Sequence, residues 1–323
     1  MPAINRSKSR TFPQILTAGL VAFAALVSWH APTRLSAEPP RPFPLPNGGM
    51  NPQQFFDRMF GADLPEDLQQ LKDIEVSAKD EQRFGRAAAQ AYLDDLRKRN
   101  VRVTSVGKDA EYLKRLVDRV RPQMRNHQRY RVIDVQVALS DDTDARCFPG
   151  GTIVFHQGLL DFALSEAALV GVIGHELSHL DNGHQLINIK RMKLAQQTMN
   201  NPSSVTPDRF FQVGSSWLRA FTRPFQPEDE TQADHDGITW AYRLGYDGRA
   251  MADLFLRLHE RDKDKPGMVM PAFLRSHPFH IDRYRALQAR HQELSQAEPN
   301  DNLYIGRQNL HLRLTRDQRV FAQ

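Results

Sequence analysis

The sequence predicts a mostly helical α+β fold with a small antiparallel sheet. Apolar residues recur every three and four positions along most of the chain, which is typical of amphipathic helices. Alternation over residues 130–139 indicates one strand, and an apolar run at 152–156 after a Pro-Gly-Gly turn indicates a second. Apolar residues make up 40% of the chain, which is enough for a packed core.

The first 37 residues are predicted to be an export signal. Arg6, Lys8 and Arg10 precede an apolar stretch at 15–29, whose length suits a signal peptide better than a full membrane span. Cleavage after Ala37 is expected, and an uncleaved membrane anchor is the alternative. A periplasmic or cell-envelope location follows, with peripheral membrane association possible.

Charge and composition limit the partners. The formal net charge is +5, but the first 37 residues hold four cations and no acid, so the remainder carries only +1. This balance gives no reason to expect nucleic-acid binding. Cys147 is the single cysteine, so no internal disulfide is expected. The oligomeric state is not predicted.

The chain is predicted to have four parts. Residues 38–75 begin rich in proline and glycine and are expected to be a linker and pre-domain segment. One folded domain is expected over 76–295, followed by a C-terminal tail over 296–323. Within the domain, helices are predicted at 79–98, 110–124, 166–180, 187–199, 227–245, 248–261 and 281–294.

The helix at 166–180 carries the most informative motif. Ser165 is a favourable N-cap, and Gly183 suits a left-handed residue after the helix end. Within it, His175 and His179 lie about 40° apart around the helix axis and one turn apart, so both can bind one Zn²⁺. Glu176, next to the first ligand, can act as the general base for water. A five-residue motif with three fixed positions also arises by chance. Two buried histidines beside a buried glutamate, however, need a partner that offsets the loss of their hydration.

The third ligand decides the type of zinc site. His184 would point about 180° away from His175 if the helix continued, so it is interpreted as a helix-end residue rather than a ligand. Glu230 is the better candidate, and Asp234 one turn later can accept a hydrogen bond from the free N–H of a zinc-bound histidine. The alternative is that the acids from Glu228 onward only favour a helix N-terminus.

These motifs resemble the HtpX and CAAX-prenyl-protease type of zinc metallopeptidases, family 48 of the metallopeptidases, in its soluble exported branch. The resemblance covers residues 76–287. The matching segments are Phe148-Pro149-Gly150-Gly151-Thr152-Ile153, Gly158-Leu159-Leu160, Gly174-His175-Glu176-Leu177-Ser178-His179, Glu230 to Asp234, Gly245-Tyr246-Asp247, and Ser276-His277-Pro278 with Arg283.

The resemblance implies a gluzincin-type domain, with the sheet beside the motif helix and one Zn²⁺ per chain. It implies that His175, His179 and Glu230 bind the zinc and that Glu176 is the base. It also implies that His277 lies near the metal, as a switchable extra ligand or a transition-state donor. Arg283 would position that region or stabilise the oxyanion. The family often has Asn-Ala-Phe-Ala where this chain has Asp144-Ala145-Arg146-Cys147, which predicts altered preferences at the strand edge.

The predicted function is a zinc-dependent endopeptidase acting on polypeptides, above all on unfolded or misassembled envelope proteins. A substrate strand is expected to add to a sheet edge through the backbone of four residues, Gly151, Thr152, Ile153 and Val154. The alternative is a zinc-stabilised periplasmic chaperone or assembly factor with low or regulated proteolytic activity.

Overall fold

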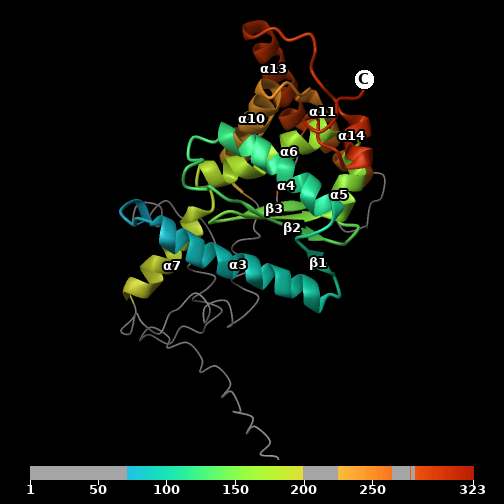
Figure 1. Ribbon diagram of the computed structural model, residues 1–323. Helices are drawn as coiled ribbons and strands as arrows, with labels where there is room; N and C mark the ends of the chain where they lie inside the picture. Colours follow the sequence, from blue (N-terminus) through green and yellow to red (C-terminus); the bar gives the residue numbers. More distant parts are fainter. Residues whose placement is uncertain (1–70, 199–224, 264–276, 278–280) are drawn as a thin grey trace, which may run out of the picture. The chain divides into compact units, whose positions relative to one another are not determined.

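The computed structural model describes residues 71–198, 225–263, 277 and 281–323 (Figure 1). The predicted export signal and most of the 38–75 segment lie outside these residues, so the predicted boundaries there stay predictions. Within the described ranges, no helix is both long and apolar enough to cross a membrane.

The predicted fold class is confirmed: helices predominate and a small sheet lies among them. The elements follow in chain order: α3 (Ala78–Lys98), β1 (Val103–Thr104), α4 (Lys108–Val120), a 3₁₀ turn (Arg121–Gln123), β2 (Asp134–Ala138), β3 (Ala145–Phe148), β4 (Thr152–His156), α5 (Gln157–Phe162), α6 (Glu166–Asp181), α7 (Leu186–Thr198), α10 (Pro227–Arg243), α11 (Arg249–Lys263), α13 (Ile281–Ala297) and α14 (Arg307–Leu312).

The sheet is mixed rather than antiparallel, which corrects the prediction. Its strand order is β1-β2-β4-β3, and β2 pairs with β4 in parallel, with Val135 opposite Ile153. The turn at 149–151 makes an antiparallel hairpin of β3 and β4, as its two positive-φ glycines allow. After β2 the chain does not form the neighbouring strand at once. It first forms β3 at the edge of the sheet, and β4 then lies between β2 and β3.

The two faces of the sheet pack against different helices. Ile153 and Phe155 of β4 point into the larger core with α4 and α6, whereas Val154 points to the other face. There it packs in a smaller core with α3 and the start of α7. Side chains along β4 therefore alternate between two apolar cores, and every residue of this strand is buried.

Helix α6 is buried along its whole length. Ser165 caps it as predicted, because its Oγ accepts a hydrogen bond from the Ala168 N–H at 3.2 Å. Gly183 has the predicted left-handed conformation, with φ +69°. The motif helix is thus fixed at both ends inside the core.

Helices α6 and α10 approach closely because small residues lie between them. A Cβ atom on Gly237 would lie 2.8 Å from the carbonyl oxygen of Gly171 and 3.0 Å from the backbone nitrogen of His175. A Cβ on Gly174 would lie 2.9 Å from the Cα of Gly237. This close approach brings the first turns of α10, with Glu230, towards the histidines of α6.

Gly237→Val is therefore expected to lower the free energy of unfolding by about 1–3 kcal/mol, the usual cost of overpacking a core. The same change should weaken zinc binding, since α10 must move away from His175. Urea denaturation and zinc titration measure the two effects. Gln232→Val, on the exposed side of α10, is the matched control, and equal behaviour of the two variants would contradict the packing argument.

The C-terminal residues, for which the sequence predicted no structure, pack against the start of α6. Tyr246 and Tyr304 form an isolated β-bridge. The backbone N–H of Arg316 donates to the carboxylate of Glu166 at 2.9 Å, and the hydroxyls of Tyr112 and Tyr246 donate to the same carboxylate. These contacts hold the N-terminal end of the motif helix in place.

Candidate metal centre and active site

Helix α6 brings His175 and His179 together as their spacing predicted. Both side chains are completely buried, and their Nε2 atoms lie 3.2 Å apart. Burial lowers the pKa of both imidazoles, so both are neutral at physiological pH. Neutral imidazole is the form that binds a metal ion.

Glu230 of α10 and His277 complete a group of four ligand atoms, all within 4.8 Å of one another. His277 Nδ1 lies 3.0 Å from His175 Nε2 and 2.9 Å from Glu230 Oε1. The Glu230 oxygens lie 3.6 Å from the Nε2 atoms of His175 and His179. No second group of this kind occurs in the ranges 71–198, 225–263 and 281–323 or at residue 277.

The spacing of these atoms fits zinc. Zinc binds histidine nitrogen at about 2.0–2.1 Å, so the corners of a tetrahedral site lie about 3.3–3.4 Å apart. Two neutral imidazoles and a carboxylate are also the donor types of known catalytic zinc sites. The group therefore suits Zn²⁺ in both donor chemistry and size.

Asp234 lies next to His175, the histidine neighbour that the sequence predicted for it. Its Oδ1 is 3.0 Å from His175 Nδ1, so Nδ1 carries the hydrogen and Nε2 keeps its lone pair for the metal group. Arg283 of α13 donates to both oxygens of Asp234, at 2.7 and 2.8 Å. Burial alone would raise the pKa of Asp234, but Arg283 and His175 together more than offset it and the pKa is lowered.

Arg283 also contacts the predicted third ligand. Its Nη1 lies 2.9 Å from Glu230 Oε2, and its side chain is only 10% exposed. One guanidinium therefore joins two buried carboxylates, from Glu230 and Asp234. This contact favours the positioning role among the two that the resemblance implied.

Glu176 contacts strand β3. Its Oε2 accepts a hydrogen bond from the backbone N–H of Cys147 at 2.9 Å, and its Oε1 lies 3.3 Å from His277 Nε2. Burial raises the pKa of Glu176 to about 8, against the lowering effect of the Cys147 hydrogen bond. A carboxylate with a pKa in this range can both accept and release a proton near neutral pH.

The expectation that Gly151, Thr152, Ile153 and Val154 lie at a sheet edge is wrong, whereas their binding of substrate stays a prediction. Strand β4 is an inner strand whose hydrogen-bonding groups face β2 on one side and β3 on the other. The edge beside Glu176 is β3 (Ala145–Phe148), close to the strand edge that the resemblance implied at residues 144–147. Residues 144–147 lack the apolar alternation of a typical strand, so their composition alone does not indicate the pairing with β4.

The outer edge of β3 is partly occupied. The Cys147 N–H donates to Glu176, and the Cys147 carbonyl accepts from Gln185 Nε2 at 2.8 Å. The His156 N–H donates to the carbonyl of Asp144, so the peptide groups of Asp144 face β4. Peptide groups alternate in direction along a strand, so those of the next residue, Ala145, face away from β4. No sequence pattern indicated the role of the Cys147 backbone.

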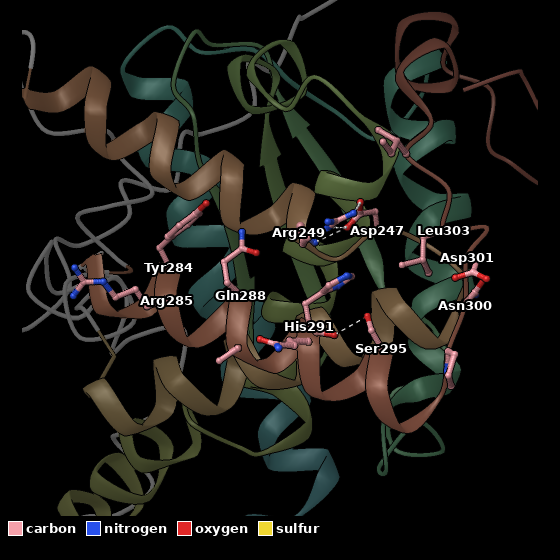
Figure 2. A pocket seen from close by; sticks show the side chains of 14 residues that line it. Asp247, Arg249, Tyr284, Arg285, Gln288, His291, Ser295, Asn300, Asp301 and Leu303 are labelled. Atoms are coloured by element: carbon pink, nitrogen blue, oxygen red, sulfur yellow. Dashed lines mark hydrogen bonds and ion pairs between the residues drawn. The ribbon is translucent and has the colours of Figure 1, made fainter.

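A separate pocket of about 920 Å³ lies between α13 and the C-terminal residues (Figure 2). Its wall includes the Asp247–Arg249 ion pair, and Tyr284, His291 and Asp301 line it from α13 and the chain that follows. None of its lining residues belongs to the metal group. The candidate chemistry therefore lies at α6 and α10.

Zinc affinity is expected to fall as the pH drops below 7. Burial raises the pKa of Glu230 to about 7, so below this pH zinc must displace a proton from the carboxylate. The histidine pKa values are lowered, so they add no competition near neutrality. One displaced proton corresponds to roughly a tenfold loss of affinity per pH unit. Chelator competition between pH 5.5 and 8 measures this slope, and a flat profile would contradict it.

Known proteins resemble this chain over the same region. The sequence profile described as Peptidase family M48 matches residues 108–291. The chain is 30% identical over 146 residues to the mitochondrial metalloendopeptidase OMA1 of Arabidopsis thaliana, covering 45% of this chain and 29% of that protein. It is 26% identical over 162 residues to the putative beta-barrel assembly-enhancing protease of Vibrio cholerae, covering 43% and 31%. The chain thus spans less than a third of the length of these two relatives.

A third relative matches over more of its length. The chain is 23% identical over 187 residues to the metalloprotease YcaL of Escherichia coli, covering 57% of this chain and 71% of that protein. The matched region in the profile comparison includes α6, α10 and the metal group.

Proposed function

Because the chain belongs to peptidase family M48, whose profile matches more than half of it, we propose that it is a zinc-dependent endopeptidase. One observation carries the proposal: the buried ligand atoms of His175, His179, Glu230 and His277 converge, and the Glu176 carboxylate lies beside them. A purely structural zinc site has no use for such a carboxylate.

The proposed roles follow from the contacts. His175, His179 and Glu230 hold the zinc, which when bound supplies a Lewis acid and lowers the pKa of water to about 7. Glu176 takes a proton from the attacking water and passes it to the leaving amine. The Cys147 N–H fixes one carboxylate oxygen at 2.9 Å, which leaves the other for this proton transfer.

His277 supplies a fourth protein donor in this conformation. A catalytic zinc site keeps one position for water or substrate, whereas four protein ligands close it. The position of His277 Nδ1, 2.9–3.0 Å from Glu230 and His175, supports the switchable ligand over the transition-state donor. In this proposal the side chain must leave before the site can act.

His277→Ala is accordingly expected to raise the rate of peptide hydrolysis and to weaken zinc binding. If the open arrangement is a minor state populated at about 10% or less, the rate should rise at least tenfold. Initial rates on fluorescein-labelled casein, at saturating zinc, measure the change. A rate well below that of the parent would instead favour the role of transition-state donor.

The proposed substrates are extended polypeptides. Once the site opens, a substrate strand would pair with the backbone of Ala145 on β3, which is buried in this conformation, and such backbone hydrogen bonds select weakly for sequence. Together with the predicted export signal, this supports unfolded or misassembled envelope proteins. Two relatives carry the names beta-barrel assembly-enhancing protease and metalloprotease, which agree with such a role.

Digestion of casein by the purified full chain tests the proposal. Cleavage should require zinc and stop with a chelator, and activity should return when zinc is added back. Cleavage that survives both Glu176→Gln and the chelator would exclude this mechanism.

A second candidate function rests on the same four donors. A closed site with four protein ligands suits a zinc-stabilised chaperone or assembly factor with little turnover. Complementation of a deletion strain separates the two functions. Full rescue by Glu176→Gln would favour the chaperone, and failure of this variant to rescue would favour the peptidase.

A further inference from the structure

The two histidines of α6 have different partners on their outer nitrogens. His175 Nδ1 faces the carboxylate of Asp234 at 3.0 Å. His179 Nδ1 instead lies 2.8 Å from Nδ1 of another histidine, His184. Since His179 Nε2 faces the metal group, its Nδ1 carries the hydrogen and donates it, and His184 Nδ1 must accept.

The end of α6 explains how His184 reaches this position. The helix ends at Asp181, and Gly183 adopts φ +69°. The chain then turns back, and the His184 N–H donates to the carbonyl of His179 at 3.1 Å. A helical continuation would have pointed the imidazole to the opposite side, so the rotation argument that excluded His184 as a ligand does not apply to this contact.

The other ring nitrogen of His184 faces an acidic residue, Asp229. An accepting Nδ1 places the hydrogen of neutral His184 on Nε2, which lies 3.6 Å from Asp229 Oδ1. This distance is in ion-pair range and longer than a hydrogen bond. Asp229 immediately precedes Glu230 on α10, so the residues around the site link the end of α6 to the start of α10.

The His179 ring is held from two directions. Phe225 stacks on it with centroids 3.7 Å apart and an interplanar angle of 15°. The contact with His184 Nδ1 fixes rotation within that plane. The His184 side chain is only 9% exposed, so solvent competes little for its nitrogen.

We propose that His184 is a positioning residue for the zinc ligand His179, fixing the orientation and tautomer of its ring. This inference rests on the zinc site of the proposed function. It gives the two histidines unequal support: a carboxylate for His175 and a neutral imidazole for His179. Loss of such an outer partner typically lowers metal affinity by about 10–100-fold.

Zinc affinity in the full chain tests the proposal without measuring peptide cleavage. All variants carry Glu176→Gln so that self-digestion cannot alter the result. His184→Ala removes the acceptor, His184→Phe keeps a ring without an acceptor, and His184→Asn restores a hydrogen-bonding atom near the position of Nδ1. His235→Ala, an exposed histidine of α10, is the matched control.

The dissociation constant for zinc is measured by chelator competition, and thermal unfolding of the metal-free proteins tests whether each variant folds. His184→Ala and His184→Phe are expected to weaken zinc binding by about 10–100-fold. His184→Asn should recover most of this loss, and His235→Ala should match the parent.

Each other result contradicts a defined part of the argument. If His184→Phe binds zinc as tightly as the parent, the ring acts only by packing and the proposal is wrong. If His184→Ala is unchanged, or Asn gives no recovery in a folded protein, the proposal is also wrong. If the parent itself does not bind zinc, the proposed function fails first, and the inference with it.

Discussion

Glu176→Gln is expected to lower the rate of peptide-bond cleavage by about 10²- to 10⁴-fold, the usual contribution of general acid–base catalysis. Glutamine has nearly the same shape and can still accept the hydrogen bond from Cys147 N–H, but it cannot take a proton from water. Zinc binding should be retained, because Glu176 is adjacent to the ligand group but is not part of it. Initial rates on labelled casein and metal content measure the two properties.

The matched control is Glu111→Gln, an exposed glutamate of α4 that makes no contact with the site. It should keep the parent rate. A Glu176→Gln variant with more than about a tenth of the parent rate would lie outside the range for a general base and would assign the proton transfer to another group. Loss of zinc together with activity would point to a structural effect.

The sequence predicted the parts of this site that local rules determine. The periodicity and caps of α6 and α10 depend on residues close in sequence, and both helices begin within a residue of their predicted starts. Helical geometry alone places His175 beside His179 and Glu230 in line with Asp234.

Other parts depend on contacts between distant segments, which no local rule supplies. Strand β3 contains a buried arginine, Arg146, and follows a buried aspartate, Asp144, so its composition does not indicate a strand and only the resemblance implied an edge there. The contact of His184 with His179 was not predicted, because a single left-handed residue, Gly183, reverses the chain just beyond the helix. The parallel pairing of β2 with β4 likewise depends on which edge β3 occupies.

Arg283→Ala is expected to lower the free energy of unfolding of the metal-free protein by about 3–5 kcal/mol, because it leaves buried charge without a partner. Glu230 and Asp234 are 2% and 5% exposed, and Arg283 contacts both at 2.7–2.9 Å. Without it, Asp234 loses the group that holds it against His175. Zinc affinity should therefore fall as well, by up to the 10–100-fold typical of outer-partner losses.

Arg285→Ala is the matched control, since Arg285 lies on the same helix but is 72% exposed and pairs only with an exposed aspartate, Asp282. Its effect should stay within about 0.5 kcal/mol. Urea denaturation of both variants, with and without zinc, separates the two roles that the resemblance implied for Arg283. An oxyanion donor would lower the turnover number and leave the metal-free stability close to that of Arg285→Ala. A positioning residue must destabilise the metal-free protein, because the two carboxylates that it joins stay buried whether or not substrate is bound.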